Sequence, residues 1–371
     1  MVDKMKPFLN IGPGEFIKEE IEYRNWKQED LADILGISLK SVNQLIKNKQ
    51  SITIEMARLL SKAFGQSPQY WINLDTNYRL RLQPENQRVK EVELRSLIYK
   101  YMPIKEMIKK NWINSADTVD ALVKEVINFW EMDNLDFTFL EKSADLHFRK
   151  SEAYQQFNAY YALTWFQMAK KITKNYSVSN YDKNALDTLV EDIHTYTTMD
   201  DGISNLLARL KQIGIKFYIL NHLQKTYIDG ASFCDNSNPV IVYTARYDRI
   251  DHFWFTMAHE IAHILLDIKK SDQFFIDDIS EIPEKGKEET ANQLASNMLR
   301  MQEILEYFRP FKKYISEFRV LNCAQDLQIN PAIVVGTLQH HGFLSHRNLN
   351  RLKPKVSEFI PQEYWFKKTN F

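Results

Sequence analysis

The pentapeptide His259-Glu260-Ile261-Ala262-His263 constrains this 371-residue chain more than any other feature. It lies in a largely apolar run from Trp254 to Leu266. On a helix, residues four apart lie on one face, so two imidazoles can bind one metal ion while Glu260 points at a water on that metal. The spacing therefore predicts a helix that carries two metal ligands with a carboxylate beside them.

A third ligand must come from elsewhere in the chain, because catalytic zinc sites use three protein ligands and leave one position for water. One large class of zinc peptidases supplies a downstream histidine, but Leu266 and Lys269 stand where that class has glycine and histidine. A glutamate on a second helix is the remaining common solution. Apolar and small residues at helical spacing predict such a helix over residues 288–299.

Two polar residues of this second predicted helix share one face. Glu288 and Asn292 are one turn apart, so Glu288 can supply the third ligand while Asn292 contacts a ligating histidine. Glu289 stays open as an alternative ligand, because spacing defines a helical face only to about 100° per residue. The sequence thus predicts a metal site built from His259, His263 and one of two adjacent glutamates.

This arrangement resembles the ImmA/IrrE family of metallo-endopeptidases, in which the HExxH helix is followed by a helix of the pattern ExxA(N/D)xFA. The chain carries that second pattern from Glu288 to Ala295, with Leu294 where the family has phenylalanine. The similarity runs from about Gly202 to Leu299. The resemblance implies a zincin-like, gluzincin-type peptidase with Zn²⁺ as cofactor. It implies metal ligation by His259, His263 and Glu288, with Asn292 next to them.

Glu260 has a role of its own in the implied reaction. Zinc polarises the scissile carbonyl and lowers the pKa of its bound water to about 7. Glu260 can then take a proton and later deliver it to the leaving amine. We therefore expect Glu260 to be the catalytic base of a peptide-bond hydrolase.

An independent motif lies near the N-terminus, where two helical segments flank a glycine. Ala32 is small enough for two helices to cross closely, and Gly36 allows a tight turn. Ser38 can cap the next helix, while Val42 and Leu45 face inward. These features together predict a helix-turn-helix.

The second helix of this motif would be the recognition helix of a DNA-binding domain. Its polar residues would be directed at the major groove: Lys40, Ser41, Asn43, Gln44 and Lys47. Lysine suits guanine or phosphate, and Asn or Gln can bond adenine through two hydrogen bonds. A protein-interaction module on the same helical scaffold stays open as an alternative.

The N-terminal region resembles the XRE/Cro-type helix-turn-helix and, more closely, its HigA-like antitoxin branch. The residues that carry the closer likeness are Pro13-Gly14-Glu15, the segment 52–57, and the segment 67–74. In the last segment Ser67 is expected to cap a helix that Pro68 begins. Lys49 stands where glycine often follows Asn48, so Asn48 is expected to take the left-handed conformation itself. The resemblance implies DNA binding, and pairing as a homodimer is common for such heads.

The remaining sequence completes an α+β fold that is mainly α. Three short strands are predicted at 216–220, 230–234 and 240–243, and they form a small sheet beside the HExxH helix. We expect an all-α helix-turn-helix domain at 1–85 and a helical connector at 86–200, which could hold a sensor. A zincin-like peptidase domain then follows at 201–310 and a helical extension at 311–371.

Composition predicts a globular protein of the cytoplasm without a membrane partner. Hydrophobic residues make up 44% of the chain and charged residues 26%, with no net formal charge. No apolar run approaches the length of about 18 residues that a membrane span needs, and the first residues lack a signal-peptide pattern. The presence of only two cysteines fits a reducing compartment.

The two resemblances together imply a DNA-binding transcriptional regulator with a zinc-dependent endopeptidase. The expected protein substrate is a helix-turn-helix repressor, either a partner or this chain itself near 83–90, whose cleavage relieves repression. The alternative is a non-proteolytic, HigA-like antitoxin or repressor of a toxin-antitoxin pair, in which the zincin domain is structural or sensory.

Overall fold

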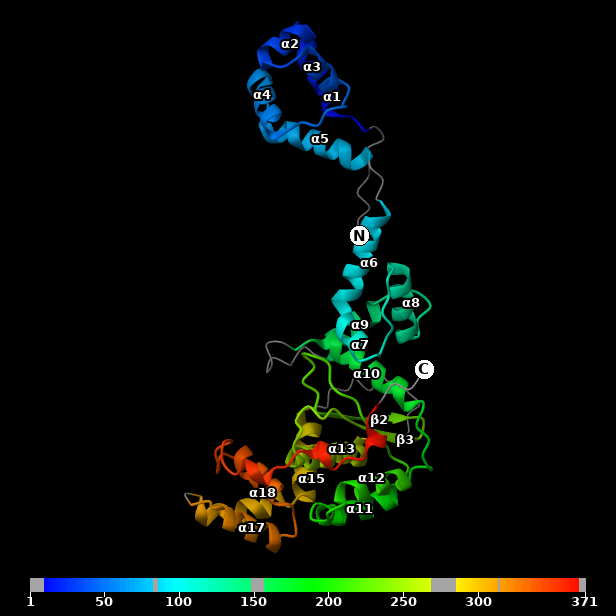
Figure 1. The fold of residues 1–371 in the computed structure, drawn as a ribbon, viewed down its shortest axis with the longest axis vertical. Coiled ribbons are helices and arrows are strands. Elements are labelled where there is room, and N and C mark those ends of the chain that lie inside the picture. The colour runs from blue at the N-terminus through cyan, green and yellow to red at the C-terminus, as the bar shows by residue number, and fades with distance from the viewer. Residues whose placement is uncertain (1–9, 83–85, 148–156, 268–284, 313, 367–371) are drawn as a thin grey trace. The chain divides into compact units, whose positions relative to one another are not determined.

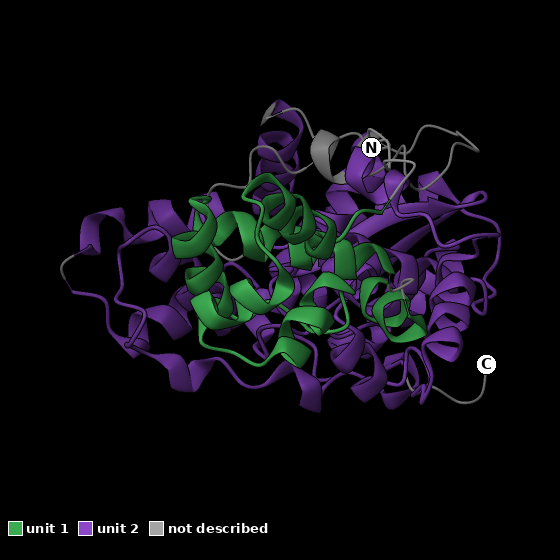
Figure 2. Ribbon diagram, turned by 90° about the horizontal axis from the view of Figure 1, so that it is seen from above, with its two compact units in different colours: residues 1–93 green, residues 94–371 purple. Residues whose placement is uncertain are grey.

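The computed structural model describes residues 10–82, 86–147, 157–267, 285–312 and 314–366. The chain divides into two compact units, residues 1–93 and residues 94–371 (Figure 2). Each unit has its own hydrophobic core. No helix among the described residues is long and apolar enough to cross a membrane.

The first unit is a bundle of short helices (Figure 1). In chain order these are α1 (Pro13–Tyr23), α2 (Gln28–Leu35), α3 (Leu39–Ile46), α4 (Ile54–Phe64) and α5 (Pro68–Leu82). Its core contains side chains with no exposed surface, among them Leu31, Val42, Leu60 and Trp71. The predicted inward positions of Val42 and Leu45 are confirmed, since both are buried.

The turn between α2 and α3 has the local chemistry that the sequence predicts. Gly36 takes a left-handed conformation with φ of 66°, and the Ser38 hydroxyl accepts a hydrogen bond from the backbone N–H of Ser41. Asn48 also has a positive φ, of 55°, and its side chain accepts a bond of 2.7 Å from the N–H of Gly14. The α1–α3 contact is close, because a Cβ on Gly14 would lie 2.0 Å from the carbonyl oxygen of Ile46.

The second unit is built around one small sheet. Its strands are β1 (Lys216–Ile219), β2 (Gly230–Asp235) and β3 (Asn238–Tyr243), in the order β1-β3-β2. Strand β1 is parallel to β3, with Lys216 opposite Val240, and β2 is antiparallel to β3, with Gly230 opposite Tyr243. The three predicted strands are therefore confirmed, and β2 lies at an edge of this sheet.

Helices cover both faces of the sheet. Successive residues of a strand point to opposite faces, so they pack into two different core clusters. Phe217 and Ile241 belong to one core cluster, whereas Tyr218, Val240 and Val242 belong to another. The second of these clusters also contains residues of helices that precede the sheet in the chain. These are α6 (Gln87–Tyr101), α7 (Ile104–Lys109), α8 (Val119–Trp130), α9 (Thr138–His147) and α10 (Ala159–Thr173).

The helices on the other face position the predicted site. They are α11 (Lys183–Tyr196), α12 (Gly202–Ile213), α13 (Ile250–Asp267), α15 (Lys285–Met298), α16 (Met301–Phe308), α17 (Glu317–Asp326) and α18 (Pro331–His340). The described residues also form short 3-10 helices: η1 (Arg309–Phe311) between α16 and α17, and after α18 η2 (Asn350–Leu352), η3 (Val356–Glu358) and η4 (Gln362–Tyr364). The fold is thus mainly α with a small sheet, as the sequence predicts.

Candidate metal centre

The HExxH pentapeptide lies on α13, which is packed firmly enough to fix its side chains. Met257, Ala258, Ile261 and Ala262 have no exposed surface and anchor the helix in the core. The two histidines sit one turn apart on the opposite face. The Nε2 atoms of His259 and His263 are 3.0 Å apart, and the rings are almost perpendicular at 84°.

Helix α15 brings a carboxylate to the two imidazoles. Its small residues Ala291 and Ala295 are fully buried, which allows α15 to approach α13 closely. Glu288 Oε1 is 3.3 Å from His263 Nε2, and Glu288 Oε2 is 3.5 Å from His259 Nε2. The carboxylate beside the histidines belongs to Glu288, whereas the Glu289 side chain is exposed.

The three side chains fit a zinc ion by donor type and by spacing. Two imidazole nitrogens and one carboxylate oxygen lie within 4.8 Å of one another, each able to offer one ligand atom. Ligand atoms about 2.1 Å from zinc in a tetrahedron lie about 3.4 Å apart. The separations of 3.0, 3.3 and 3.5 Å between the atoms of His259, His263 and Glu288 match that spacing.

The electrostatics of the cluster favour the protonation states that bind a cation. Burial lowers the pKa of His259, and the neighbouring His263 lowers it further. A hydrogen bond with His263 lowers the pKa of Glu288. Asn292, one turn after Glu288, forms a side-chain hydrogen bond with His259, and this bond acts in the opposite direction and raises the pKa of His259. A neutral imidazole and an ionised carboxylate are the ligating forms of these groups.

The side chain of Glu260 lies in the contact between α13 and β2, where His263 and Glu288 still act on it electrostatically. Glu260 is only 6% exposed. Burial raises the pKa of Glu260 to about 7, although a hydrogen bond with Ser232 acts in the opposite direction. Gly230 leaves space for this side chain, because a Cβ there would lie 2.8 Å from Glu260 Oε1 and 2.6 Å from Thr256 Cγ2.

Polar residues that the sequence did not assign to a site continue along the same face of α13. His252, Thr256 and Glu260 are spaced four apart, and this helical spacing is the sequence signal that could have placed His252 and Thr256 beside Glu260. His252 Nε2 is 3.5 Å from Asp229 Oδ2, and its Nδ1 is 3.4 Å from the Thr256 hydroxyl. Arg246 donates a 3.1 Å hydrogen bond to Asp229. Asp229, which precedes β2, is thus bonded to Arg246 and lies next to His252 of α13.

The five predicted DNA-contacting residues all lie on α3 or at its C-terminal end. The Lys40 and Lys47 side chains are exposed, and Gln44 is partly exposed. Two of the five make local hydrogen bonds: the Ser41 hydroxyl is 2.9 Å from that of Ser38, and the Asn43 amide donates to the Leu39 carbonyl at 3.1 Å. The structure therefore gathers all five on α3 and its C-cap in the first unit, whereas the metal cluster belongs to the second.

Comparison with known families matches both parts of the chain. Residues 17–71 match the helix-turn-helix model, and residues 211–338 match the IrrE N-terminal-like domain of peptidase family M78. The chain belongs to the helix-turn-helix family through its first unit. Its second unit carries the match to the M78 model. The resemblances to the XRE-type helix-turn-helix and to the ImmA/IrrE family are therefore confirmed, whereas the closer likeness to the HigA-like branch stays a prediction. The M78 match spans α13 and α15 and so contains the whole candidate metal centre.

Similar individual proteins share only about a fifth of this chain. An uncharacterised HTH-type transcriptional regulator of Haemophilus influenzae is 35% identical over 79 residues, which cover 21% of this chain and 74% of that protein. The uncharacterised HTH-type transcriptional regulator YddM of Escherichia coli is 34% identical over 76 residues, or 20% of this chain and 81% of that protein. A crystal structure of a hypothetical protein from E. coli is 33% identical and covers 22% of this chain and 84% of its own, with a TM-score of 0.21.

Proposed function

We propose that this protein is a DNA-binding transcriptional regulator whose second unit is a zinc-dependent endopeptidase. The observation that carries the proposal is the convergence of three ligand atoms from α13 and α15, with the Glu260 carboxyl on the same helix as the two histidines. The family matches support both halves of this proposal. A cytoplasmic location remains a prediction from composition.

His259, His263 and Glu288 would hold the zinc ion, and Asn292 would restrain the orientation of His259. When bound, zinc supplies a Lewis acid that polarises a carbonyl group and acidifies water. The polar face of α13 provides the two imidazoles for such an ion. Glu289 would remain outside the site, since its side chain is exposed.

Glu260 would move the protons of the reaction. A buried carboxyl with a pKa of about 7 can both accept and release a proton near neutral pH. Ser232 on β2 would hold the carboxyl in one orientation through its hydrogen bond, and Gly230 leaves the room that this orientation needs. The roles of base and then acid would therefore fall on one residue whose position both α13 and β2 define.

Helix α3 would read DNA through Lys40, Ser41, Asn43, Gln44 and Lys47. The helix-turn-helix match and the names of the similar bacterial regulators support this role. Such heads bind as pairs to two half-sites, so we also propose a homodimer. For substitutions of the lysines of this set, the matched control is a substitution of Lys18 on α1, an exposed lysine of the same unit that lies outside α3.

The proposed substrate is a helix-turn-helix repressor, because the fused DNA-binding head would bring the peptidase to such proteins at their operators. The substrate would be a partner repressor or the chain itself near 83–90, of which residues 83–85 lie outside the described residues. The competing proposal is a non-proteolytic antitoxin or repressor in which the zincin domain is structural or sensory. Its relatives' names as transcriptional regulators favour that class as well.

The deciding experiment compares the zinc-loaded wild-type protein with Glu260→Gln and Glu289→Gln against purified helix-turn-helix repressors and against its own chain. We expect Glu260→Gln to lose about 10²–10⁴-fold in cleavage rate, because it removes the proton-transfer group. Glu289→Gln should cleave as the wild type does. Equal cleavage by the wild type and Glu260→Gln would rule out the proposed base. No cleavage by either protein, with zinc and DNA still bound, would favour the non-proteolytic regulator.

A further inference from the structure

Large aromatic side chains are exposed around the start of α17. Phe311, Tyr314 and Phe318 have 37%, 76% and 72% of their surface exposed, although they lie within a short stretch of chain. Leu321, one turn further along α17, is 43% exposed. Isolated exposed apolar residues are ordinary, but a contiguous group of this kind is typical of a surface that binds a protein, a membrane or a ligand.

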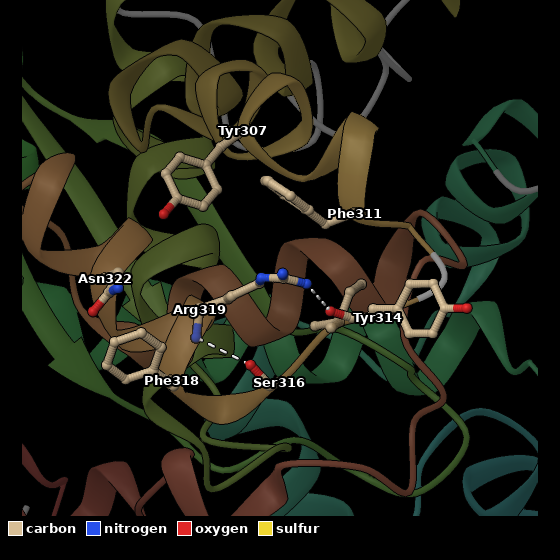
Figure 3. Close-up of a pocket in the computed structure, with 8 residues that line it drawn as sticks. Tyr307, Phe311, Tyr314, Ser316, Phe318, Arg319 and Asn322 are labelled. Carbon is tan, nitrogen blue, oxygen red and sulfur yellow. Dashed lines mark hydrogen bonds between the residues drawn. The ribbon is translucent and has the colours of Figure 1, made fainter.

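These aromatic residues surround a cavity of about 590 Å³ (Figure 3). Four of its eight lining residues are aromatic, namely Tyr307, Phe311, Tyr314 and Phe318. Among the described residues that line it, Arg319 alone is charged, and Asn322 adds an amide. A wall that combines aromatic side chains with a few fixed polar groups is the usual composition of a recognition site.

Arg319 is held in place while part of its guanidinium stays available. Its Nη1 donates a 2.6 Å bond to the carbonyl oxygen of Tyr314, and its guanidinium carbon is 4.2 Å from the centroid of the Phe311 ring. Within the described parts of the chain, no hydrogen bond uses Nε or Nη2 of this side chain. A fixed guanidinium with free N–H groups binds a carboxylate at little cost in side-chain entropy.

The charges around the cavity favour an anionic partner. The nearby acid Glu317 is paired with Arg351, whose Nε lies 3.1 Å from Glu317 Oε1. On η1 and just after it, Arg309 and Lys312 form no salt bridge with any described acidic residue. Lys312 instead lies 4.5 Å from the centroid of the Phe343 ring. Asp326 is close enough to contribute to the raised pKa of Tyr307, behind the larger effect of burial. The charge that lines the cavity itself, among the described residues, is the positive one of Arg319.

We propose that this surface, made of Tyr307, Phe311, Tyr314, Phe318 and Arg319, is a docking site for an acidic segment of a partner protein. The segment would insert an aromatic side chain into the cavity and place a carboxylate on Arg319. A protein partner fits better than a small molecule, because Tyr314 and Phe318 expose most of their surface around the opening. Tyrosine and arginine in a central position are typical anchors of protein interfaces.

This docking site does not depend on the proposed peptidase activity. All of its residues lie on α16, η1, α17 and the chain between them, whereas the candidate metal ligands lie on α13 and α15. Peptide binding can therefore be measured on the full chain with or without zinc. A failure of the docking proposal and a failure of the peptidase proposal would be separate results.

The test measures fluorescence polarisation of a short labelled peptide in which glutamate alternates with phenylalanine. One comparison peptide has lysine in place of glutamate, and another has alanine in place of phenylalanine. We expect the full-length protein to bind the first peptide at least about tenfold more tightly than either comparison peptide, since each lacks one of the two required contacts. Lack of binding by the first peptide, or equal binding of all three, overturns the proposal.

Variants locate the binding on the protein. Arg319→Gln and Phe318→Ala should each weaken binding of the first peptide at least about tenfold. Arg209→Gln on α12 and Phe359→Ala after η3 are matched controls, because both are partly exposed and lie on other elements. Thermal unfolding verifies that each variant is folded, and Phe318 is exposed enough for its loss to leave packing intact. Unchanged binding by folded Arg319→Gln and Phe318→Ala overturns the proposal.

Discussion

Glu260 and Glu288 are glutamates next to the same two histidines, yet their surroundings shift their pKa values in opposite directions. Burial raises the pKa of Glu260 to about 7, whereas the hydrogen bond with His263 lowers that of Glu288. One carboxyl is thus suited to carry a proton, and the other is suited to bind a cation. The division of roles follows from position, because both residues are chemically the same.

The first prediction concerns the third metal ligand. Glu288→Gln should weaken zinc binding at least about 100-fold, because it removes the anionic ligand and leaves only two imidazoles. Glu289→Gln is the matched control, since its side chain is exposed, and its affinity should equal that of the wild type. Competition with a chromophoric zinc chelator measures both affinities. Weaker binding by Glu289→Gln and not by Glu288→Gln would assign the ligand to the neighbouring residue.

Sequence spacing predicted the residues that lie on one helix better than those that meet across two elements. The positions of His259 and His263 follow from helical geometry alone, and the left-handed conformations of Gly36 and Asn48 follow from local chemistry. The contact between Ser232 and Glu260 could not be predicted in this way. It depends on how β2 packs against α13, which no local pattern encodes.

At the scale of elements, the contact between β2 and α13 determines where Glu260 sits. Gly230 permits this contact, because any Cβ at that position would come within 2.6 Å of Thr256 Cγ2. The strand belongs to the sheet through its register with β3, where Gly230 is opposite Tyr243. The side chain of Glu260 and the backbone of an edge strand therefore share one tightly packed interface.

The second prediction tests this interface with Gly230→Ala. The added methyl group must displace Thr256 or Glu260, so we expect a loss of about 1–3 kcal/mol in the free energy of unfolding. Gly286→Ala on α15 is the control, because a Cβ there would meet no atom of the described residues within 4 Å, and alanine favours a helix by about 1 kcal/mol. Urea unfolding followed by tryptophan fluorescence measures both. Equal stability of Gly230→Ala and the wild type would contradict the tight contact.

The helices before the sheet show a further limit of prediction from sequence. Helical spacing indicates helices between residues 86 and 200, and the described residues of that range form α6 to α11. The spacing does not show that α10 packs on the sheet, where the Trp165 indole donates a 3.2 Å bond to the carbonyl of Leu220. This contact joins residues 55 apart in the chain, so only the folded structure brings them together. The proposed four-part division of the chain remains a prediction.

At the scale of the whole molecule, the buried residues form cores that stay within one unit or the other. Leu60 and its neighbours belong to the core of residues 1–93, and Leu206 belongs to a core of residues 94–371. The proposed regulator with two functions can use such an arrangement, because a change in one core need not alter the other. Stability should then divide between the units in the same way.

The third prediction follows from these separate cores. Leu60→Ala on α4 and Leu206→Ala on α12 each remove a fully buried leucine, which costs about 2–5 kcal/mol. We expect calorimetry of the full chain to show two transitions, with each substitution lowering the midpoint of only its own unit's transition. The two variants serve as each other's control, since the residue type and burial are the same. If either substitution lowered both midpoints equally, the cores would be energetically coupled, and the DNA-binding head would have to unfold together with the unit that carries His259 and Glu288.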